Sequence, residues 1–159
     1  MITNKATLND EKTVAFRDMI EHRATWFYFL IDEAKKRGLK LDFAHDAIMK
    51  CGAFHGVNKF PQTDNIEEFT KSFANDNVQA IFEMAVNTTE EELNIEFHYC
   101  PLVNAWKKLT DDEAFIDELC DIAMDGDRGI ISQNEHLSFE LGDTIAKGCK
   151  TCKVRISRI

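Results

Sequence analysis

The stretch Ile95-Glu96-Phe97-His98-Tyr99-Cys100-Pro101-Leu102-Val103 decides the fold, because it predicts a strand that passes directly into a helix. Apolar and polar residues alternate from Leu93 to Tyr99, which is the period of a half-buried strand. Pro101 suits the first position of a helix, since its fixed φ fits there and no N–H is needed. Cys100 is therefore predicted at the N-cap, where the positive end of the helix dipole favours a thiolate.

The segments around this stretch predict the other strands of a small antiparallel sheet. Residues 82–86 alternate in the same way, so the connection at 88–91 predicts a hairpin with the strand that ends at Tyr99. Alternation returns at 137–141 and at 152–156, and residues 147–150 join these last two segments. The sequence therefore predicts a sheet of about four strands.

Helices are predicted mainly in the N-terminal half. Apolar residues keep helical spacing over 11–36, and Gly38 offers a C-cap, so we interpret this segment as a core or dimer-facing helix. Shorter helices are predicted over 42–52 and 66–74, and two more, over 101–109 and 112–124, follow Cys100. Residues 1–10 are predicted to be a flexible arm, and Asp125–Gly129 a loop.

These elements predict an α+β fold within one domain spanning residues 1–159. A helical N-terminal half packs on a small antiparallel sheet of about four strands, and two helices are inserted after the second strand. The length suits one domain, and the 44% apolar content with twelve Phe and two Pro is typical of a globular chain with a sizeable core.

Composition also limits the classes of binding partner that are expected. The formal net charge is −9, and no Lys/Arg-rich run is present, so nucleic acid and an anionic membrane surface are not expected as partners. Residues 1–12 are polar and lack the apolar core of a secretory signal, and the longest apolar run, residues 26–31, is too short to cross a bilayer. Five cysteines without an export signal then predict reduced thiols in the cytoplasm.

Cys100 and His98 are the first candidates for chemistry. By strand parity their side chains share a face, so His98 is placed to act as base or acid beside a thiolate. The alternative is that Cys100 is a buried residue that fills the turn, because cysteine is among the most buried residue types. In that case His98 lies on the solvent side of the strand.

Carboxylates near 121–127 are further candidates. Asp121 and Asp127 are predicted to orient a water or a substrate nitrogen, although a solvated turn explains the same acids. Cations available to hold a substrate carboxylate include Arg155 and Arg128.

The cysteines allow one alternative role. Cys149 and Cys152 form a single C-x-x-C, and with Cys100 and Cys120 they would supply four thiolates for a structural zinc or an iron–sulfur centre. No second pair has that spacing, so the preferred interpretation is that no metal and no cofactor is bound.

The chain resembles the L-2-amino-thiazoline-4-carboxylic acid hydrolase-like family. The residues that carry the resemblance are Phe97–Val103, Ala105–Leu109, Glu118–Ile122, Gly126-Asp127 and the segment from Ile145 through Gly148 to Cys152. The resemblance implies an enzyme that adds water to an aminothiazoline ring at the carbon between sulfur and nitrogen, giving an N-carbamoyl cysteine. Tyr99 and Trp106 lie in these blocks and are expected to contact the substrate.

The leading hypothesis is therefore hydrolysis of a carbon–nitrogen bond in a small cyclic amidine. Cys100 attacks the ring carbon or positions the water, His98 moves protons, and Asp121 or Asp127 orients water or substrate. The alternative is a small-molecule-binding or sensory domain without turnover, whose pocket is walled by the aromatic residues 26–29. In either case the partner is a small molecule, and the helix over 11–36 is a candidate surface for a homo-oligomer.

Overall fold

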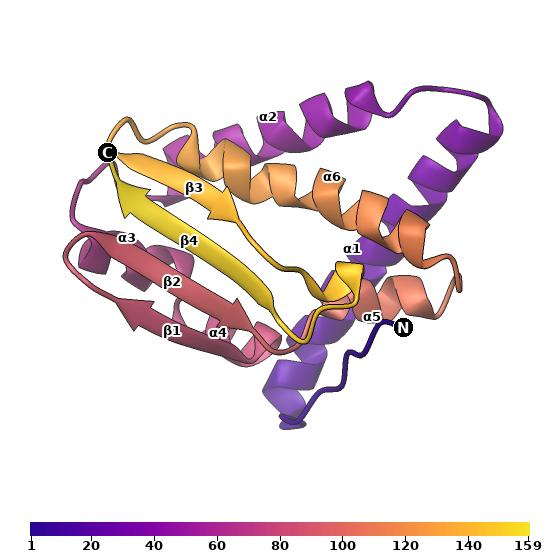
Figure 1. Ribbon diagram of the computed structural model, residues 1–159, viewed down its shortest axis with the longest axis horizontal. Helices are drawn as coiled ribbons and strands as arrows, with labels where there is room; N and C mark the ends of the chain where they lie inside the picture. Colours follow the sequence, from indigo (N-terminus) through magenta and orange to yellow (C-terminus); the bar gives the residue numbers. More distant parts are fainter.

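The computed structural model describes residues 1–159 and confirms the α+β architecture (Figure 1). Its six α-helices are α1 (Glu11–Lys36), α2 (Asp42–Lys59), α3 (Ile66–Phe73), α4 (Asp76–Phe82), α5 (Pro101–Lys107) and α6 (Glu113–Ile131). Its strands are β1 (Met84–Thr88), β2 (Glu92–Phe97), β3 (Leu137–Leu141) and β4 (Cys152–Arg158), and a short 3₁₀ helix, η1 (Ile145–Lys147), precedes β4.

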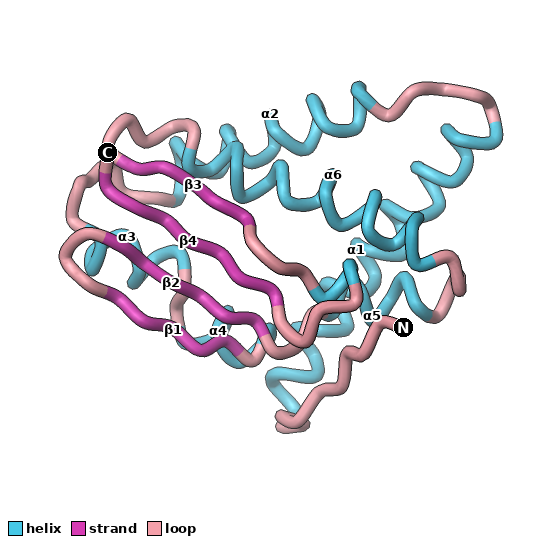
Figure 2. The backbone as a smooth tube through the Cα atoms, in the orientation of Figure 1, coloured by secondary structure: helices cyan, strands magenta, loops and turns pink.

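The four strands form one antiparallel sheet in the order β1-β2-β4-β3 (Figure 2). Ile95 of β2 pairs with Val154 of β4, so alternate residues of both central strands point to one face. On that face an apolar cluster joins the sheet to α3 and to the end of α6; its members include Ile66, Phe69, Leu93, Ile95, Ile131, Val154 and Ile156. The opposite face carries polar residues and no helix.

A second, larger apolar cluster lies between α1, α5 and α6. It includes Tyr28 and Ile31 of α1, Trp106 of α5, and Leu119 and Ile122 of α6. Phe27 packs its ring 6.2 Å from that of Trp106, and Tyr28 packs 5.4 Å from Phe115. The long N-terminal helix is confirmed and is anchored in the core through these residues, whereas Val14, Met19 and Leu30, which keep the helical spacing on which the prediction rested, are exposed.

Helices α2 and α6 approach each other unusually closely. A Cβ atom placed on Gly52 of α2 would lie 2.1 Å from the carbonyl oxygen of Gly126, and one placed on Gly129 of α6 would lie 2.3 Å from that of Met49. The two backbones are in contact at these glycines, because no side chain separates them.

The predicted loop at Asp125–Gly129 is wrong, because α6 continues through it to Ile131. Glycine and aspartate are weak helix formers, but packing against α2 overrides that preference. The same packing extends α2 to Lys59, beyond the predicted end at Gly52. Helix α4 was missed, because its last residue, Phe82, continues the alternation of the strand that follows.

The N-terminal arm forms no regular element, but it is held in place rather than loose. Ile2 is 2% exposed and belongs to the larger apolar cluster. Asn4 hydrogen-bonds the backbone of Cys100, while Thr7 and Leu8 bind the carboxylate of Glu83. The prediction of a flexible arm at 1–10 fails, because these contacts are with residues distant in the chain.

Candidate functional site

Cys100 lies where the sequence predicted it, at the N-cap of α5 with Pro101 in the first turn. The N-terminal arm fixes the turn: the Cys100 N–H donates to Oδ1 of Asn4 at 2.9 Å, and Nδ2 of Asn4 donates to the Cys100 carbonyl at 2.8 Å. One asparagine side chain therefore satisfies both backbone groups of the N-cap residue, so the position of Cys100 is strongly determined.

The thiol of Cys100 is not a thiolate. Burial raises its pKa to about 12, and the neighbouring Cys152 adds to the rise, while the backbone N–H groups of Val103 and Leu102 act only weakly in the other direction. The expected effect of the helix dipole is thus outweighed by desolvation, and a helix of two turns supplies little of it. At neutral pH the thiol is protonated.

Three of the four cysteines considered for a metal lie near one another. Cys100 and Cys152 pack against the cluster that contains Cys120, and burial raises the pKa values of Cys152 and Cys120 as well, that of Cys152 to about 11. Sγ of Cys152 accepts a hydrogen bond from the N–H of Ile145 at 3.1 Å. Cys149 is partly exposed, and no group of three or more His, Cys, Asp or Glu side chains is arranged to hold a metal ion.

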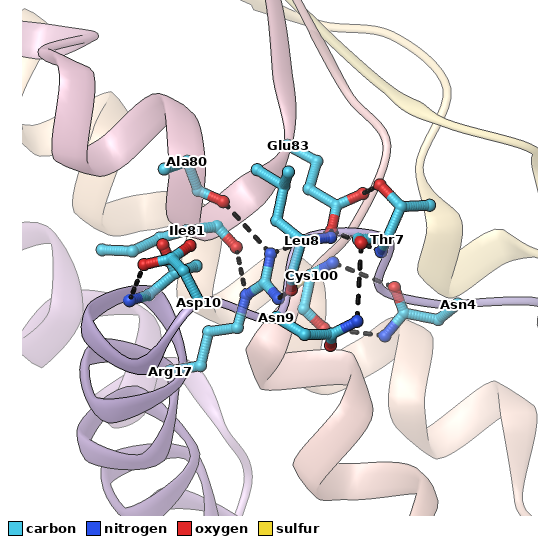
Figure 3. Close-up of polar contacts among 11 residues, drawn as sticks. Asn4, Thr7, Leu8, Asn9, Asp10, Arg17, Ala80, Ile81, Glu83 and Cys100 are labelled. Atoms are coloured by element: carbon cyan, nitrogen blue, oxygen red, sulfur yellow. Dashed lines mark hydrogen bonds and ion pairs between the residues drawn. The ribbon is translucent and has the colours of Figure 1, made fainter.

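A buried ion pair supports the same turn (Figure 3). Nη2 of Arg17 lies 3.0 Å from Oε1 of Glu83, and both side chains are less than a tenth exposed. The guanidinium also donates to three backbone carbonyls, those of Leu8, Ile81 and Ala80.

Glu83 completes this network from the junction of α4 and β1. Its carboxylate accepts hydrogen bonds from the N–H groups of Thr7 and Leu8 and from the Thr7 hydroxyl. Burial alone would raise the pKa of Glu83, but these donors and Arg17 outweigh it and lower the pKa below its ordinary value. The arm, α1 and the sheet meet at one ionised pair.

Tyr99 and Trp106, the expected substrate contacts, belong to the core. The guanidinium of Arg17 lies 4.4 Å from the centre of the Tyr99 ring, and burial raises the pKa of Tyr99 to about 12. Trp106 is 1% exposed, and its Nε1–H donates to the carbonyl of Ala24 at 3.0 Å. Both rings position the turn that holds Cys100.

His98 and Arg155 lie outside this buried region. Nε2 of His98 is 4.0 Å from a carboxylate oxygen of Glu96 on the exposed side of the chain, and no hydrogen bond joins the imidazole to Cys100. Arg155 is on the polar face of the sheet and pairs with Glu140. A shallow hollow of about 470 Å³ lies on that face, and Arg155 and Glu96 help to line it.

Asp121 and Arg128 lie on the outer side of α6 in a chain of ion pairs. Arg128 donates to Asp121 at 2.8 Å and to Asp125 at 2.7 Å. The other oxygen of Asp125 is 2.6 Å from Nδ1 of His45 on α2. His45 received no role from the sequence, because the partner of its imidazole is 80 residues away. Asp121 also borders an open hollow of about 520 Å³.

Asp127 has a different environment. By helical periodicity it lies on the stripe of α6 that carries Cys120 and Ile131, one from each apolar cluster. Its carboxylate makes no hydrogen bond. Burial raises the pKa of Asp127 to about 6, against the opposing influence of Arg23 and Arg128. It is a partly buried acid that can exchange a proton near neutral pH.

The predicted site residues thus divide among four places. The Cys100 turn gathers Cys100, Tyr99 and Trp106; the sheet face and its end carry His98 and Arg155; the outer side of α6 carries Asp121 and Arg128; and Asp127 faces inward. Sequence reasoning missed Asn4, Arg17 and Glu83. No local signal marked them: Arg17 shares the buried side of α1 with Thr13 and Ala24, which do not form an apolar stripe in the sequence.

The aromatic residues 26–29 do not enclose a pocket together. Tyr28 and Phe27 pack in the core, whereas Trp26 and Phe29 are 70% and 51% exposed.

No helix of the structure is both long enough and apolar enough to span a membrane.

Comparison with known proteins identifies relatives at two levels. The chain is similar in fold to a trafficking protein particle complex subunit 3 from Naegleria fowleri, solved covalently bound to palmitic acid: the TM-score is 0.56 at 14% identity, covering 87% of this chain and 94% of that one. No curated protein matches the sequence. The family model for L-2-amino-thiazoline-4-carboxylic acid hydrolase matches residues 17–156. The chain therefore belongs to the L-2-amino-thiazoline-4-carboxylic acid hydrolase family.

Proposed function

We propose that the protein hydrolyses a small ring in which one carbon is bonded to both sulfur and nitrogen, as the name of its family describes. The observation that carries the proposal is the family match over residues 17–156, which spans the Cys100 turn and Asp127. The environments of these two residues then suggest how the work is divided between them.

The reaction determines which groups are needed. Water adds across the carbon–nitrogen double bond of the ring, so its oxygen bonds to carbon and one of its protons goes to the ring nitrogen. The second proton leaves the oxygen as the carbonyl forms, and the carbon–sulfur bond opens as sulfur takes up that proton. N-carbamoyl cysteine keeps both bonds from this carbon to nitrogen. The bond that breaks is therefore the carbon–sulfur bond, and not the carbon–nitrogen bond named in the hypothesis from the sequence. The enzyme must supply one group that accepts the proton of water and can return it to sulfur.

Asp127 is the residue we assign to this proton transfer. A group whose pKa is about 6 is mostly ionised at neutral pH, yet its protonated form is accessible within the catalytic cycle. His98 and Asp121 are less suited, because each is exposed and already pairs with a charged neighbour, Glu96 and Arg128 respectively.

Cys100 is assigned a positioning role rather than that of nucleophile. Its thiol is protonated and half-buried, so it can donate a hydrogen bond but attacks carbon poorly. Arg23 is our candidate for the substrate carboxylate, because it is exposed, makes no ion pair, and is near enough to Asp127 to affect its pKa. The earlier candidates Arg155 and Arg128 are both engaged by carboxylates.

The first prediction separates the two roles of Cys100. With 2-aminothiazoline-4-carboxylate as substrate, the wild type is expected to release a free thiol and a product heavier by one water. Cys100→Ser should keep measurable turnover, because a hydroxyl can donate the same hydrogen bond, whereas Cys100→Ala should lose most of it. Cys149→Ser, at a partly exposed thiol, is the matched control and should match wild type. Equal inactivity of the serine and alanine variants would return Cys100 to the role of nucleophile.

The second prediction concerns Asp127→Asn, which should lower kcat about 100-fold or more while raising stability. The folded pKa of about 6 exceeds the ordinary value of 3.8, so ionisation opposes folding. The penalty grows as pH rises from about 4 to about 6 and is constant above, up to about 3 kcal/mol. Urea unfolding should therefore find the variant about 1–3 kcal/mol more stable at pH 7.5, with the difference shrinking towards pH 4.

Asp111→Asn, at an exposed position, is the control and should leave the stability within about 0.5 kcal/mol of the wild type. A loss of stability in Asp127→Asn at pH 7.5 would show that the carboxylate has a structural partner, and would remove the proton-transfer assignment.

A second candidate function is ligand binding without turnover. What favours it is the group of three neighbouring thiols in and against the larger apolar cluster, Cys100, Cys120 and Cys152, together with the fold likeness to a protein that holds palmitic acid covalently. The same assay distinguishes the two. Saturable stabilisation by the thiazoline without product, or an acyl-sized mass increase on the intact protein after exposure to palmitoyl-CoA, supports binding.

A further inference from the structure

The outer side of α1 carries an unpartnered apolar stripe. Trp26 is 70% exposed, Met19 and Leu30 are each 62% exposed, and Phe29 is 51% exposed. By helical periodicity these four residues lie on the side of α1 opposite to its buried residues, among which are Ala24 and Ile31. The helix therefore has one side in the core and one side that nothing in the chain covers.

The stripe is large enough to form a specific interface. Two aromatic and two long aliphatic side chains exposed to this degree present on the order of 500 Å² per chain, all within twelve residues of one helix. Two such surfaces facing each other would bury about 1,000 Å², the lower bound for a specific interface, before the polar side chains beside them are counted. Monomeric proteins rarely leave a contiguous patch of this size open unless it binds something.

We propose that α1 pairs antiparallel with α1 of a second copy, about a two-fold axis at the level between residues 27 and 28. Residues equally far from the axis along the helix then lie level with each other, so Trp26 of one copy meets Phe29 of the other at the centre. Exposed His22 lies level with Glu33, one turn further out on the same stripe. A two-fold interface requires such matching, because the same surface must fit itself.

The charges beside the stripe fit the same register. Asp18 and Lys36 lie on one flank, because about five helical turns separate them. A two-fold axis brings equal flanks together, so Asp18 of one copy falls within one residue of the level of Lys36 of the other.

Both side chains are available for this pairing. Asp18 is exposed and makes no ion pair within the chain, and Lys36, which pairs with Asp32, has further donors because an ammonium group has three. No two like charges lie level with each other along α1 in this register. The net charge of −9 makes an anionic membrane the less suitable occupant of this face.

The first test measures the oligomeric state. Light scattering at micromolar concentrations should find a dimer, and Trp26→Lys should raise its dissociation constant by about 100-fold or more, because the axis places Trp26 in the interface twice. Phe54→Lys, at a residue of α2 that is 63% exposed, is the matched control and should leave the dimer intact. Trp26→Lys should keep the wild-type circular dichroism spectrum and melting temperature at concentrations where both proteins are monomeric.

The unmodified chain supplies a second measurement. Of its two tryptophans, Trp106 is 1% exposed, so a change in the environment of tryptophan on dilution comes from Trp26. The fluorescence emission should move to longer wavelength on dilution, in step with the loss of the dimer in light scattering.

A charge exchange tests the register. Asp18→Lys should weaken the dimer about 10-fold, and Asp18→Lys/Lys36→Glu should recover most of that loss. A monomer throughout the concentration range overturns the proposal, as does a dimer that Trp26→Lys leaves unchanged, or a double variant that recovers nothing. Co-sedimentation of the monomer with anionic vesicles, abolished by Trp26→Lys, would assign the face to a membrane and overturn it as well.

Discussion

Gly52→Ala is expected to destabilise the fold by about 3 kcal/mol or more, through a single added methyl group. The methyl carbon would lie 2.1 Å from the carbonyl oxygen of Gly126 and 3.0 Å from the Cα of Gly129. These are backbone atoms, so no side chain can rotate away, and α2 and α6 must separate along their whole contact. Gly129→Ala meets the carbonyl oxygen of Met49 at 2.3 Å from the other side and should have a similar effect.

Gly126→Ala is the matched control, in the same helix and one turn from Gly129. Its added carbon would meet only Cγ2 of Ile48 at 3.8 Å, an ordinary contact. Alanine favours a helix interior over glycine, so this variant should be stabilised by about 0.5–1 kcal/mol. Urea unfolding of the three variants measures their free energies of unfolding and tests this order of stability.

The double variant Gly52→Ala/Gly129→Ala should lose less than the sum of its parts, because one separation of the helices relieves both clashes. Unchanged stability in Gly52→Ala would contradict a direct contact between the backbones of α2 and α6.

The segment Asp125–Gly129 shows the limit of predicting secondary structure from local sequence. Asp-Gly-Asp-Arg-Gly has the composition of a loop, and the sequence predicted one. Gly129 is needed for close approach to α2 rather than for turning the chain, a requirement set by Met49 and Gly52, which lie far earlier in the sequence. By contrast, the period-two alternation of β2, β3 and β4 is a local signal, and all three strands were predicted.

The candidate site likewise has features that the local sequence predicts and features that depend on remote residues. The place of Cys100 at a helix N-cap follows from the neighbouring Pro101, and it was predicted correctly. Its protonation state depends on burial by α6 and β4, and on the nearby Cys152, which no local pattern reveals. The partners of Arg17 also come from remote segments, the arm and the α4–β1 junction, so its burial could not be foreseen.

Arg17→Met is expected to destabilise the protein by about 3–5 kcal/mol. The substitution leaves the carboxylate of Glu83 buried without its cation, and removes the side-chain donor from the carbonyl of Ile81. For a domain whose total stability is about 5–15 kcal/mol, a loss of this size exposes much of the population to unfolding. Chemical denaturation at neutral pH measures it directly, with Arg37→Met, an arginine on the surface, as the control.

Two further variants identify what Arg17 contributes. Arg17→Lys keeps the charge, but one ammonium group cannot reach Leu8, Ile81 and Glu83 together, so it should recover less than half of the loss. Adding Glu83→Gln to Arg17→Met should give back part of the stability, because the unpaired charge is removed.

The pH dependence of the stability follows from the direction in which the pKa of Glu83 is shifted. Its pKa is lowered in the folded state, so the pair contributes stability above the ordinary value of 4.5 and loses it as pH falls. Wild type and Arg17→Met should therefore converge in stability as the solution is made acidic. The arm should become accessible to protease in the same pH range, because Glu83 is the residue that holds Thr7 and Leu8. A constant difference between the two proteins down to acid pH would show that Arg17 acts through its carbonyl contacts alone.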